Sequence, residues 1–446
     1  FELPEGWEWC RVRDIAAVKG GKRLPKGVGF SPCRTAHAYI RVTDMKNHCI
    51  NTDDLKYISE EVFLQIKNYT ISKDDLYVTI AGTIGVTGEV PTELDGMNLT
   101  ENAVKITNIQ INKNYLCLII QSEFVQQQFQ DKTHQVAMPK LALERILSTL
   151  IPVCTITTQS AMVSKFVEMD SLINQIREEK EILAETVSLT KSKILDLAIR
   201  GKLVPQNPDD EPASVLLERI RAEKEELIKA GKIKRDKKES IIFKGDDNSY
   251  YEKVGVEIRC IDSEIPFEIP DGWMYERLGN ICSIARGGSP RPIENYLTDD
   301  ENGLNWIKIG DTEQGGKYIY STKEKIRPEG LSKTRYVCSG DFLLTNSMSF
   351  GRPYILRTNG CIHDGWLVIG GIEIAFHQDY LYYMLSSSIM YNALSSLAVG
   401  STVKNLKSDS VKSLLVPIPP LAEQACISRQ IENYFATMLP IERSLS

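Results

Sequence analysis

Residues 159–200, QSAMVSKFVEMDSLINQIREEKEILAETVSLTKSKILDLAIR, form the stretch on which the predicted fold depends. No Pro or Gly interrupts it before Gly201, and apolar residues recur at alternating steps of four and three residues. This spacing is typical of a helix with one narrow apolar stripe, here called the first seam. Its positions are Met162, Phe166, Met169, Ile173, Ile176, Lys180, Leu183, Val187, Thr190, Ile194 and Leu197, of which only Lys180 and Thr190 break the apolar pattern. About forty residues predict a rod of about 60 Å, which needs a partner helix.

A second stripe with the same step lies at the C-terminal end of the sequence. Its positions, here called the second seam, are Ile427, Ile431, Tyr434, Met438, Ile441 and Leu445. They match the beginning of the first seam after a shift of 265 residues. A single seam is more often a helix lying on the core of its own domain. Two seams in one register favour an intramolecular coiled coil.

The composition bounds the class of protein. A chain of 446 residues, 42% hydrophobic and 25% charged, is long enough for two or three domains. Its apolar runs are too short for a membrane span, and no signal peptide is visible. Ten cysteines without a CxxC pair are typical of reduced thiols in a cytoplasmic protein. The net charge of -6 does not favour nucleic-acid binding, so any basic surface must be local.

An internal repeat divides the chain into two similar halves. The sequence LPEGWEW at 3–9 returns as IPDGWMY at 269–275, and a Gly-Gly pair flanked by cations follows at 20–21 and at 287–288. Strand-like and then helical patterns follow in the same order in both halves. Each half therefore reads as one mixed α/β domain followed by a long helix. If the two helices pack antiparallel, the duplication predicts pseudo-two-fold symmetry.

The fold class predicted in this way is α+β, with two similar mixed α/β domains separated by a long antiparallel two-helix coiled coil. The expected parts are a first domain at 1–158, the first long helix at 159–200, a connector at 201–258, a second domain at 259–420 and a second, short helix at 421–446.

The connector begins where the first long helix must end. Gly201 suits a helix C-cap, and three prolines follow it within the next eleven residues. Ala213–Ala230 is predicted to form a charged helix, and the basic run KIKRDKK at 232–238 a mobile linker. Such a run is usually solvated, although contact with nucleic acid is the alternative.

No motif for catalysis is present. The sequence contains no P-loop, HExxH, nucleophile elbow or EF-hand spacing. Its five histidines are isolated from one another and from metal-ligand spacing. His363 and Asp364 could form a base with its orienting acid, but adjacent residues of a strand point to opposite faces, so a loop or core histidine is the better interpretation.

Three further motifs carry a resemblance to a known family. KILDLAIRGKLVPQ at 193–206, DEPA at 210–213 and VPIPPLAEQ at 416–424, together with the paired Pro-Glu/Asp-Gly-Trp openings, resemble the DNA specificity subunit of Type I restriction-modification systems. The resemblance implies two target-recognition domains that each read half of a bipartite double-stranded DNA sequence, held apart by the helical pair. It also implies two methyltransferase subunits and restriction/translocase subunits as partners. S-adenosylmethionine, ATP and Mg are then expected on those partners and no cofactor, metal or catalytic site in this chain.

The sequence departs from the family pattern at its C-terminal end. The second seam has six positions where the first has eleven, and the LAIRGKLVP segment is not repeated. A shorter helical spacer and a smaller partner-docking surface than in the family pattern are therefore expected.

The repeat also suggests which residues contact DNA. Cations and small polar residues in equivalent loops are expected to bind phosphates and base edges. They are Lys22, Arg23, Arg41, Thr83 and Lys140 in the first domain and Arg286, Arg291, Lys308, Ser349, Arg352 and Lys404 in the second. Lys140 and Lys404 rank highest because they match in both halves. For each residue the alternative is a solvated surface side chain. For the whole chain, the alternatives are a coiled-coil scaffold without DNA readout or a nucleic-acid-modifying enzyme with an unrecognised site.

Overall fold

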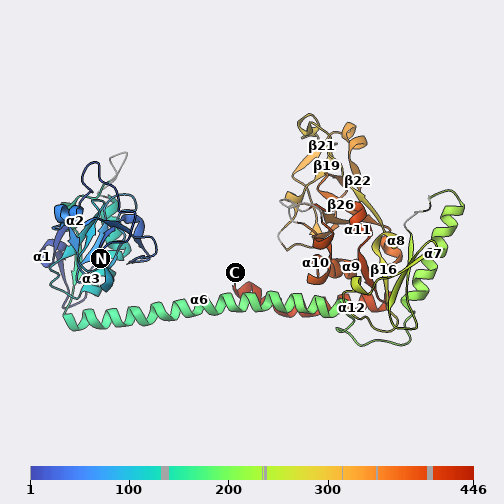
Figure 1. Cartoon of the computed structure of the whole chain (residues 1–446), viewed down its shortest axis with the longest axis horizontal. Coiled ribbons are helices and arrows are strands. Elements are labelled where there is room, and N and C mark those ends of the chain that lie inside the picture. The colour runs from blue at the N-terminus through green and yellow to red at the C-terminus, as the bar shows by residue number, and fades with distance from the viewer. Residues whose placement is uncertain are drawn as a thin grey trace. The chain divides into compact units, whose positions relative to one another are not determined.

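The structure is a computed structural model that describes residues 2–131, 140–233, 235, 239–313, 315–347, 350–398 and 405–445. The chain divides into two compact units, Phe1–Glu178 and Glu179–Ser446. Helix α6 (Ile156–Ile199) begins in the first unit and ends in the second. The two mixed α/β domains, residues 1–158 and 259–420, are called the first and second target domains after the role that the resemblance implies. Figure 1 shows the strands of the first unit in blue to cyan, α6 in green, and the second target domain in yellow to red.

Two four-stranded sheets form the domain of the first unit. One has the order β2-β11-β8-β9 and the other the order β6-β3-β10-β7, in which β10 and β3 run parallel. A third, two-stranded sheet pairs β1 with β12 and joins the two ends of the domain. The strands are β1 (Glu8–Arg11), β2 (Ala17–Gly20), β3 (His37–Ile40), β4 (Met45–Lys46), β5 (Cys49–Ile50), β6 (Lys56–Ile58), β7 (Thr70–Ile71), β8 (Leu76–Thr79), β9 (Thr87–Glu89), β10 (Met97–Leu99), β11 (Ala103–Thr107) and β12 (Leu150–Val153).

Short helices pack on these sheets, α2 on the sheet that contains β3 and β6 and the other four on the sheet that contains β8 and β11. They are α1 (Val12–Ile15), α2 (Glu60–Ile66), α3 (Lys113–Gln121), α4 (Glu123–Asp131) and α5 (Leu143–Leu147). Asn112 starts α3 because its side chain accepts a hydrogen bond from the backbone N–H of Tyr115, 3.1 Å away. Leu116, Ile120 and Phe129 are fully buried on the core side of α3 and α4.

The second target domain repeats this order with one additional strand in each sheet. Its sheets run β17-β26-β23-β24-β20 and β18-β21-β19-β25-β22, and β19 pairs with β25 in parallel as β3 does with β10. The strands are β16 (Met274–Arg277), β17 (Ser283–Arg286), β18 (Leu297–Thr298), β19 (Leu304–Ile307), β20 (Tyr318–Ile319), β21 (Glu324–Ile326), β22 (Arg335–Val337), β23 (Phe342–Thr345), β24 (Pro353–Leu356), β25 (Gly360–Ile362), β26 (Trp366–Gly370) and β27 (Leu415–Ile418). The helices are α8 (Leu278–Ile281), α9 (Gln378–Ser386), α10 (Ser388–Leu397) and α11 (Ser408–Lys412). The predicted duplication of one mixed α/β domain is confirmed.

Each domain is joined to its long helix by a buried glutamine. The side-chain oxygen of Gln159 accepts a hydrogen bond from Asn112 N at 2.9 Å, and its amide donates to Cys154 O at 2.7 Å. In the second domain Gln424 repeats both contacts, from His377 N at 2.8 Å and to Pro419 O at 3.1 Å. The two glutamines are 1% and 0% exposed, so these bonds fix the start of each helix inside its domain.

The second long helix, α12 (Leu421–Leu445), packs antiparallel on the C-terminal part of α6. Gln206, which follows the end of α6, binds Glu423 at the start of α12. Lys191, which lies within α6, binds Glu442 near the end of α12. Figure 1 shows α12 in red beside the C-terminal part of α6 in green. Apolar side chains of both helices belong to one core with the second target domain. The buried positions of the two seams are Val187, Ile194, Ile427, Ile431 and Met438. Leu197 and Leu445 are partly buried.

The remaining positions of the predicted coiled-coil interface are exposed. Met162, Phe166, Met169, Ile173, Ile176 and Leu183 of the first seam are 40–56% exposed, as are Tyr434 at 41% and Ile441 at 37% in the second. Within the described residues, α12 with its 25 residues does not cover these positions of α6, which has 44 residues, in keeping with the six seam positions of the second helix against eleven in the first. Beyond its contact with α12, α6 presents its apolar stripe to solvent.

Residues from the sequence motifs before and after the connector contact each other where α6 ends and α12 begins. Trp273 Nε1 donates to Glu423 Oε2 at 2.7 Å, and Gln206 Nε2 donates to Glu423 Oε1 at 2.7 Å. Burial raises the pKa of Glu423, although these two donors oppose the rise. The second Pro-Asp-Gly-Trp opening therefore fixes the beginning of α12.

The connector is more ordered than its composition indicates. It contains the predicted charged helix, α7 (Ala213–Lys229), and a three-stranded antiparallel sheet that the sequence did not reveal. The strands of this sheet are β13 (Ser240–Lys244), β14 (Tyr250–Val254) and β15 (Glu257–Cys260). Within the basic run at 232–238, Arg235 binds Glu225 at 2.6 Å, while residues 234 and 236–238 lie outside the described part of the chain.

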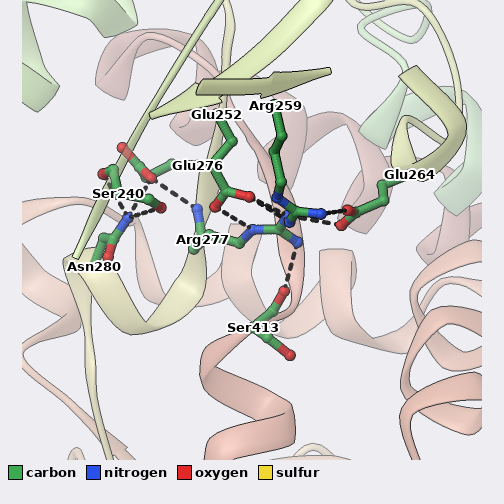
Figure 2. A network of polar contacts seen from close by, with 8 residues as sticks. All are labelled: Ser240, Glu252, Arg259, Glu264, Glu276, Arg277, Asn280 and Ser413. Atoms are coloured by element: carbon green, nitrogen blue, oxygen red, sulfur yellow. Dashed lines mark hydrogen bonds and ion pairs between the residues drawn. The ribbon is translucent and has the colours of Figure 1, made fainter. Parts of the chain in front are cut away.

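A network of charged side chains attaches this sheet to the second target domain (Figure 2). Arg277 donates to Glu252 Oε2 at 2.9 Å, to Glu264 Oε2 at 2.7 Å and to the carbonyl oxygen of Ser413 at 2.9 Å. Arg259 adds a second cation beside Glu252. Burial alone would raise the pKa of Glu252, but the hydrogen bonds from Arg277 and its neighbours outweigh burial and lower the pKa to about 2.

Candidate nucleic-acid interface

The Gly-Gly pairs lie at the ends of β2 and β17, where each strand passes a loop from the other sheet. Gly21 N donates to Ala103 O at 3.1 Å, and Gly287 N donates to Trp366 O at 3.0 Å. A Cβ at Gly21 would clash with the carbonyl oxygen of Thr100, and one at Gly287 with that of His363. Glycine is therefore needed at both positions for close backbone approach rather than for a two-residue hairpin turn.

The loop beside Gly21 contains Glu101, which contacts two of the cations that were predicted to bind DNA. Arg23 Nε lies 2.7 Å from Glu101 Oε1, and Lys140 Nζ donates to the backbone oxygen of Glu101 at 3.2 Å. Thr100 Oγ1 donates to Glu101 Oε2 at 3.1 Å. Lys22 is exposed next to Arg23. The structure thus brings together three of the five residues predicted for the first domain.

The second domain has the same arrangement around Asp364. Ser289 Oγ donates to Asp364 Oδ1 at 2.8 Å, and Arg291 Nη2 lies 3.3 Å from Asp364 Oδ2. Arg286 Nε donates to the backbone oxygen of Asp364 at 2.8 Å, and Asn346 Nδ2 donates to the same oxygen at 2.7 Å. Arg286 and Arg291, both predicted, therefore lie at one loop.

Glu101 and Asp364 occupy equivalent places in the repeat. Each lies between the strand that pairs in parallel with its neighbour, β10 or β25, and the next strand, β11 or β26. Burial alone would raise the pKa of each carboxyl, but hydrogen bonds from Arg23 to Glu101 and from Ser289 to Asp364 lower both pKa values. Both side chains are therefore anionic at neutral pH. Neither carboxylate was predicted as a DNA-binding residue, although each follows the end of an equivalent strand, β10 or β25, by two positions.

Arg41 and Lys308 also occupy equivalent positions, but their side chains are bound within their own domains. The Arg41 guanidinium binds Asp44 at 2.6 Å, and Lys308 Nζ binds Glu324. Lys308 also lines a surface pocket of about 600 Å³ beside the second Gly-Gly loop. Arg291, Trp306 and His363 line the same pocket.

The other predicted residues lie elsewhere or outside the description. Thr83 is exposed, and its carbonyl oxygen accepts a hydrogen bond from Thr79. Arg352 is exposed at a pocket that Ser192 of α6 also lines, and the structure does not bring it to the Arg286 cluster. Ser349 and Lys404 lie outside the described residues.

His363 does not form a hydrogen-bonded pair with Asp364. Its Nδ1 lies 3.6 Å from Asp364 Oδ1 and 2.8 Å from the backbone nitrogen of Gly365. Burial lowers the pKa of His363, which favours the neutral imidazole. This geometry agrees with a loop histidine rather than a base held by its acid.

Comparison with known proteins decides the family. The model of the Type I restriction modification DNA specificity domain matches residues 4–185 and 270–445, which are the two copies of the repeat. The chain belongs to the Type I restriction-modification DNA specificity family. Among the relatives in this specificity family, the EcoEI specificity subunit of Escherichia coli is 24% identical over 98% of this chain and 78% of its own length. The EcoAI specificity subunit of Escherichia coli is 27% identical over 64% of this chain and 53% of its own length.

Solved structures share the fold of this specificity protein. A chain from a structural study of complex assembly and conformational transition in the type I R-M system aligns with a TM-score of 0.61 and 17% identity, over 100% of this chain and 94% of the other. The HsdS subunit from Thermoanaerobacter tengcongensis aligns with a TM-score of 0.54 and 16% identity, over 100% and 93%. Within the described ranges, no helix of the specificity protein has the length and apolar character that crossing a bilayer requires.

Proposed function

We propose that each target domain of this chain reads one half of a bipartite double-stranded DNA sequence, and that the chain directs partner subunits to that sequence. The observation that carries the proposal is the repeated cluster of cations around the Gly-Gly loops, Arg23 and Lys140 in one domain and Arg286 and Arg291 in the other. Cations of this kind bind phosphates and set the register on the duplex, while neighbouring side chains reach base edges.

The chemistry is assigned to partners. Two methyltransferase subunits would transfer a methyl group from S-adenosylmethionine to adenine N6, and restriction subunits would use ATP and Mg for translocation and cleavage. This chain would contribute recognition and no catalytic group, and it would act on cellular DNA in the cytoplasm. Because its net charge is -6, the isolated chain should bind DNA weakly at physiological salt, with the methyltransferase subunits completing the clamp.

Methylation mapping tests the proposal. The chain is co-expressed with its methyltransferase subunits, and methylated adenines are mapped across the host genome. We expect one split motif with a fixed gap. Replacing residues 1–158 with those of a relative should change one half of the motif and leave the other half and the gap intact. A change in both halves, or methylation by the purified chain alone, would contradict the proposal.

A second candidate is a coiled-coil scaffold, which the exposed first-seam residues from Met162 to Leu183 favour. A scaffold would bind protein partners through this stripe without reading DNA. Co-expression would then give a stable complex that leaves the DNA unmodified, whereas recognition by the two domains predicts methylated adenines in a split motif.

A further inference from the structure

Each cluster of cations surrounds a carboxylate, which phosphate binding alone does not explain. A carboxylate a few ångströms from a phosphate weakens binding through Coulomb repulsion. Glu101 and Asp364 nevertheless lie at the centre of their clusters in both domains, and both keep their negative charge. A feature present in both copies of the repeat calls for a role beyond phosphate contact.

The arginine partners of these carboxylates are exposed and easily released. The side chain of Arg23 is 79% exposed, and that of Arg291 is 81% exposed. Exposed pairs of this kind are weak, because water and salt screen them. A DNA phosphate can therefore take either arginine from its carboxylate at little cost. Exchange of this kind would free one carboxylate oxygen in each loop.

Other donors hold the carboxylates in place when the arginines leave. Thr100 Oγ1 still donates to Glu101, and Ser289 Oγ still donates to Asp364 at 2.8 Å. The backbone of the Asp364 loop is fixed separately by Asn346, which is 0% exposed. Each loop thus presents an acceptor on a rigid support, as direct readout of a base requires.

The chemistry of base edges selects the group that such an acceptor would bind. In the major groove cytosine offers its N4 amino group as a donor, whereas adenine places the N7 acceptor beside its N6 amino group. The second oxygen of a carboxylate is repelled by adenine N7, and guanine and thymine offer acceptors at the same edge. A carboxylate therefore favours cytosine.

We propose that Glu101 and Asp364 are specificity-determining residues, each accepting a hydrogen bond from the N4 amino group of a cytosine in one half of the DNA target. In this arrangement Arg23 and Arg291 leave their carboxylates for neighbouring phosphates. The inference rests on the proposed function, because it assigns bases to the domains that read them.

The test compares Glu101→Gln and Asp364→Asn in the full complex with methyltransferase subunits. Methylation rates are measured on a library in which every base pair of the wild-type motif is varied in turn. Glu101→Gln should lower discrimination at one C·G pair in one half-motif by about tenfold or more and leave the other half unchanged. Asp364→Asn should do the same in the other half. Each half-motif serves as an internal control for the other.

Control variants separate base reading from folding and from placement of the arginines. Glu144→Gln removes another exposed pair of the first domain, with Arg13 at 2.7 Å, and should leave every preference unchanged. Glu101→Asp keeps the charge and should retain the preference for cytosine at a lower rate. If the melting temperature shows that Glu101→Gln does not fold, the base preference of Asp364→Asn alone tests the proposal.

Two outcomes would overturn the inference. One is a rate that falls equally on all targets, as Arg23→Ala should cause, with the base preferences unchanged. The other is a wild-type motif with no C·G pair in a half-site. The proposed function fails separately if the wild-type complex methylates no split motif.

Discussion

Lys191 of α6 and Glu442 of α12 form a bidentate ion pair, with Nζ 2.7 Å from both carboxylate oxygens. The same ammonium group lies 5.1 Å from the centre of the Phe435 ring. Together with the contact between Gln206 and Glu423, the ion pair fixes the antiparallel register, because Gln206 follows Lys191 in the sequence whereas Glu423 precedes Glu442. The pair lies near the C-terminal end of α12.

Charge reversal at this pair should reduce stability modestly. Lys191→Glu and Glu442→Lys should each destabilise the second unit, and the double reversal should recover part of the loss. Since the two side chains are 27% and 38% exposed, we expect a coupling free energy of about 0.2–1 kcal/mol. A double-mutant cycle on urea unfolding measures it. A coupling of zero would show that the contact does not set the register.

The apolar contact between α6 and α12 should contribute more to the free energy of unfolding than this ion pair does. Ile431 is 0% exposed in the core shared by α6, α12 and the second target domain. Ile431→Ala should lower the free energy of unfolding by about 2–5 kcal/mol, because it removes buried methyl groups and leaves a cavity. Ile441→Ala, on the same helix but 37% exposed, is the matched control and should have a much smaller effect. Equal effects would contradict the packing described above.

Replacement of Gly21 should destabilise the first domain, whereas replacement of Gly20 should not. Gly21→Ala places a Cβ against the carbonyl oxygen of Thr100, whereas the corresponding Cβ at Gly20 has no neighbour within 4 Å. We expect Gly21→Ala to cost about 1–3 kcal/mol and to displace the Glu101 loop. Gly20→Ala should be tolerated. Thermal unfolding and methylation of the corresponding half-motif are the measurements, and identical behaviour of the two variants would count against the close approach.

Acid should weaken the attachment of the connector sheet. The pKa of Glu252 is about 2 in the folded chain and 4.5 in the unfolded chain. The stabilisation from this lowered pKa is complete above pH 4.5 and is lost as the pH falls toward 2. Glu252→Gln should remove this part of the acid dependence of unfolding, while Glu257→Gln on the exposed strand β15 should keep it. Unchanged acid unfolding in Glu252→Gln would contradict the assignment.

The parts of the fold that sequence analysis recovered are those with a regular pattern. The four-three spacing predicted α6 and α12, and repeated motifs predicted the duplicated domain. The sheet β13–β15 was missed because its strands are short and follow a basic run that is typical of a linker. Glu101 was missed because it is 78 residues from Arg23 in sequence, and the contact between them depends on how two sheets meet. The uncovered part of the first seam was already indicated by the sequence, because the second seam has six positions and the first has eleven.

The glutamine contacts at the start of α6 and α12 have a consequence for how such a protein changes over time. Gln159 and Gln424 bond to main-chain atoms of their domains, so these particular hydrogen bonds do not depend on which side chains the domains carry there. A foreign domain that is introduced by recombination and has the same backbone turn can therefore form the same hydrogen bonds with the glutamine of the helix. New sequence preferences can thus arise by exchange of whole modules, without waiting for compensating substitutions in the helices.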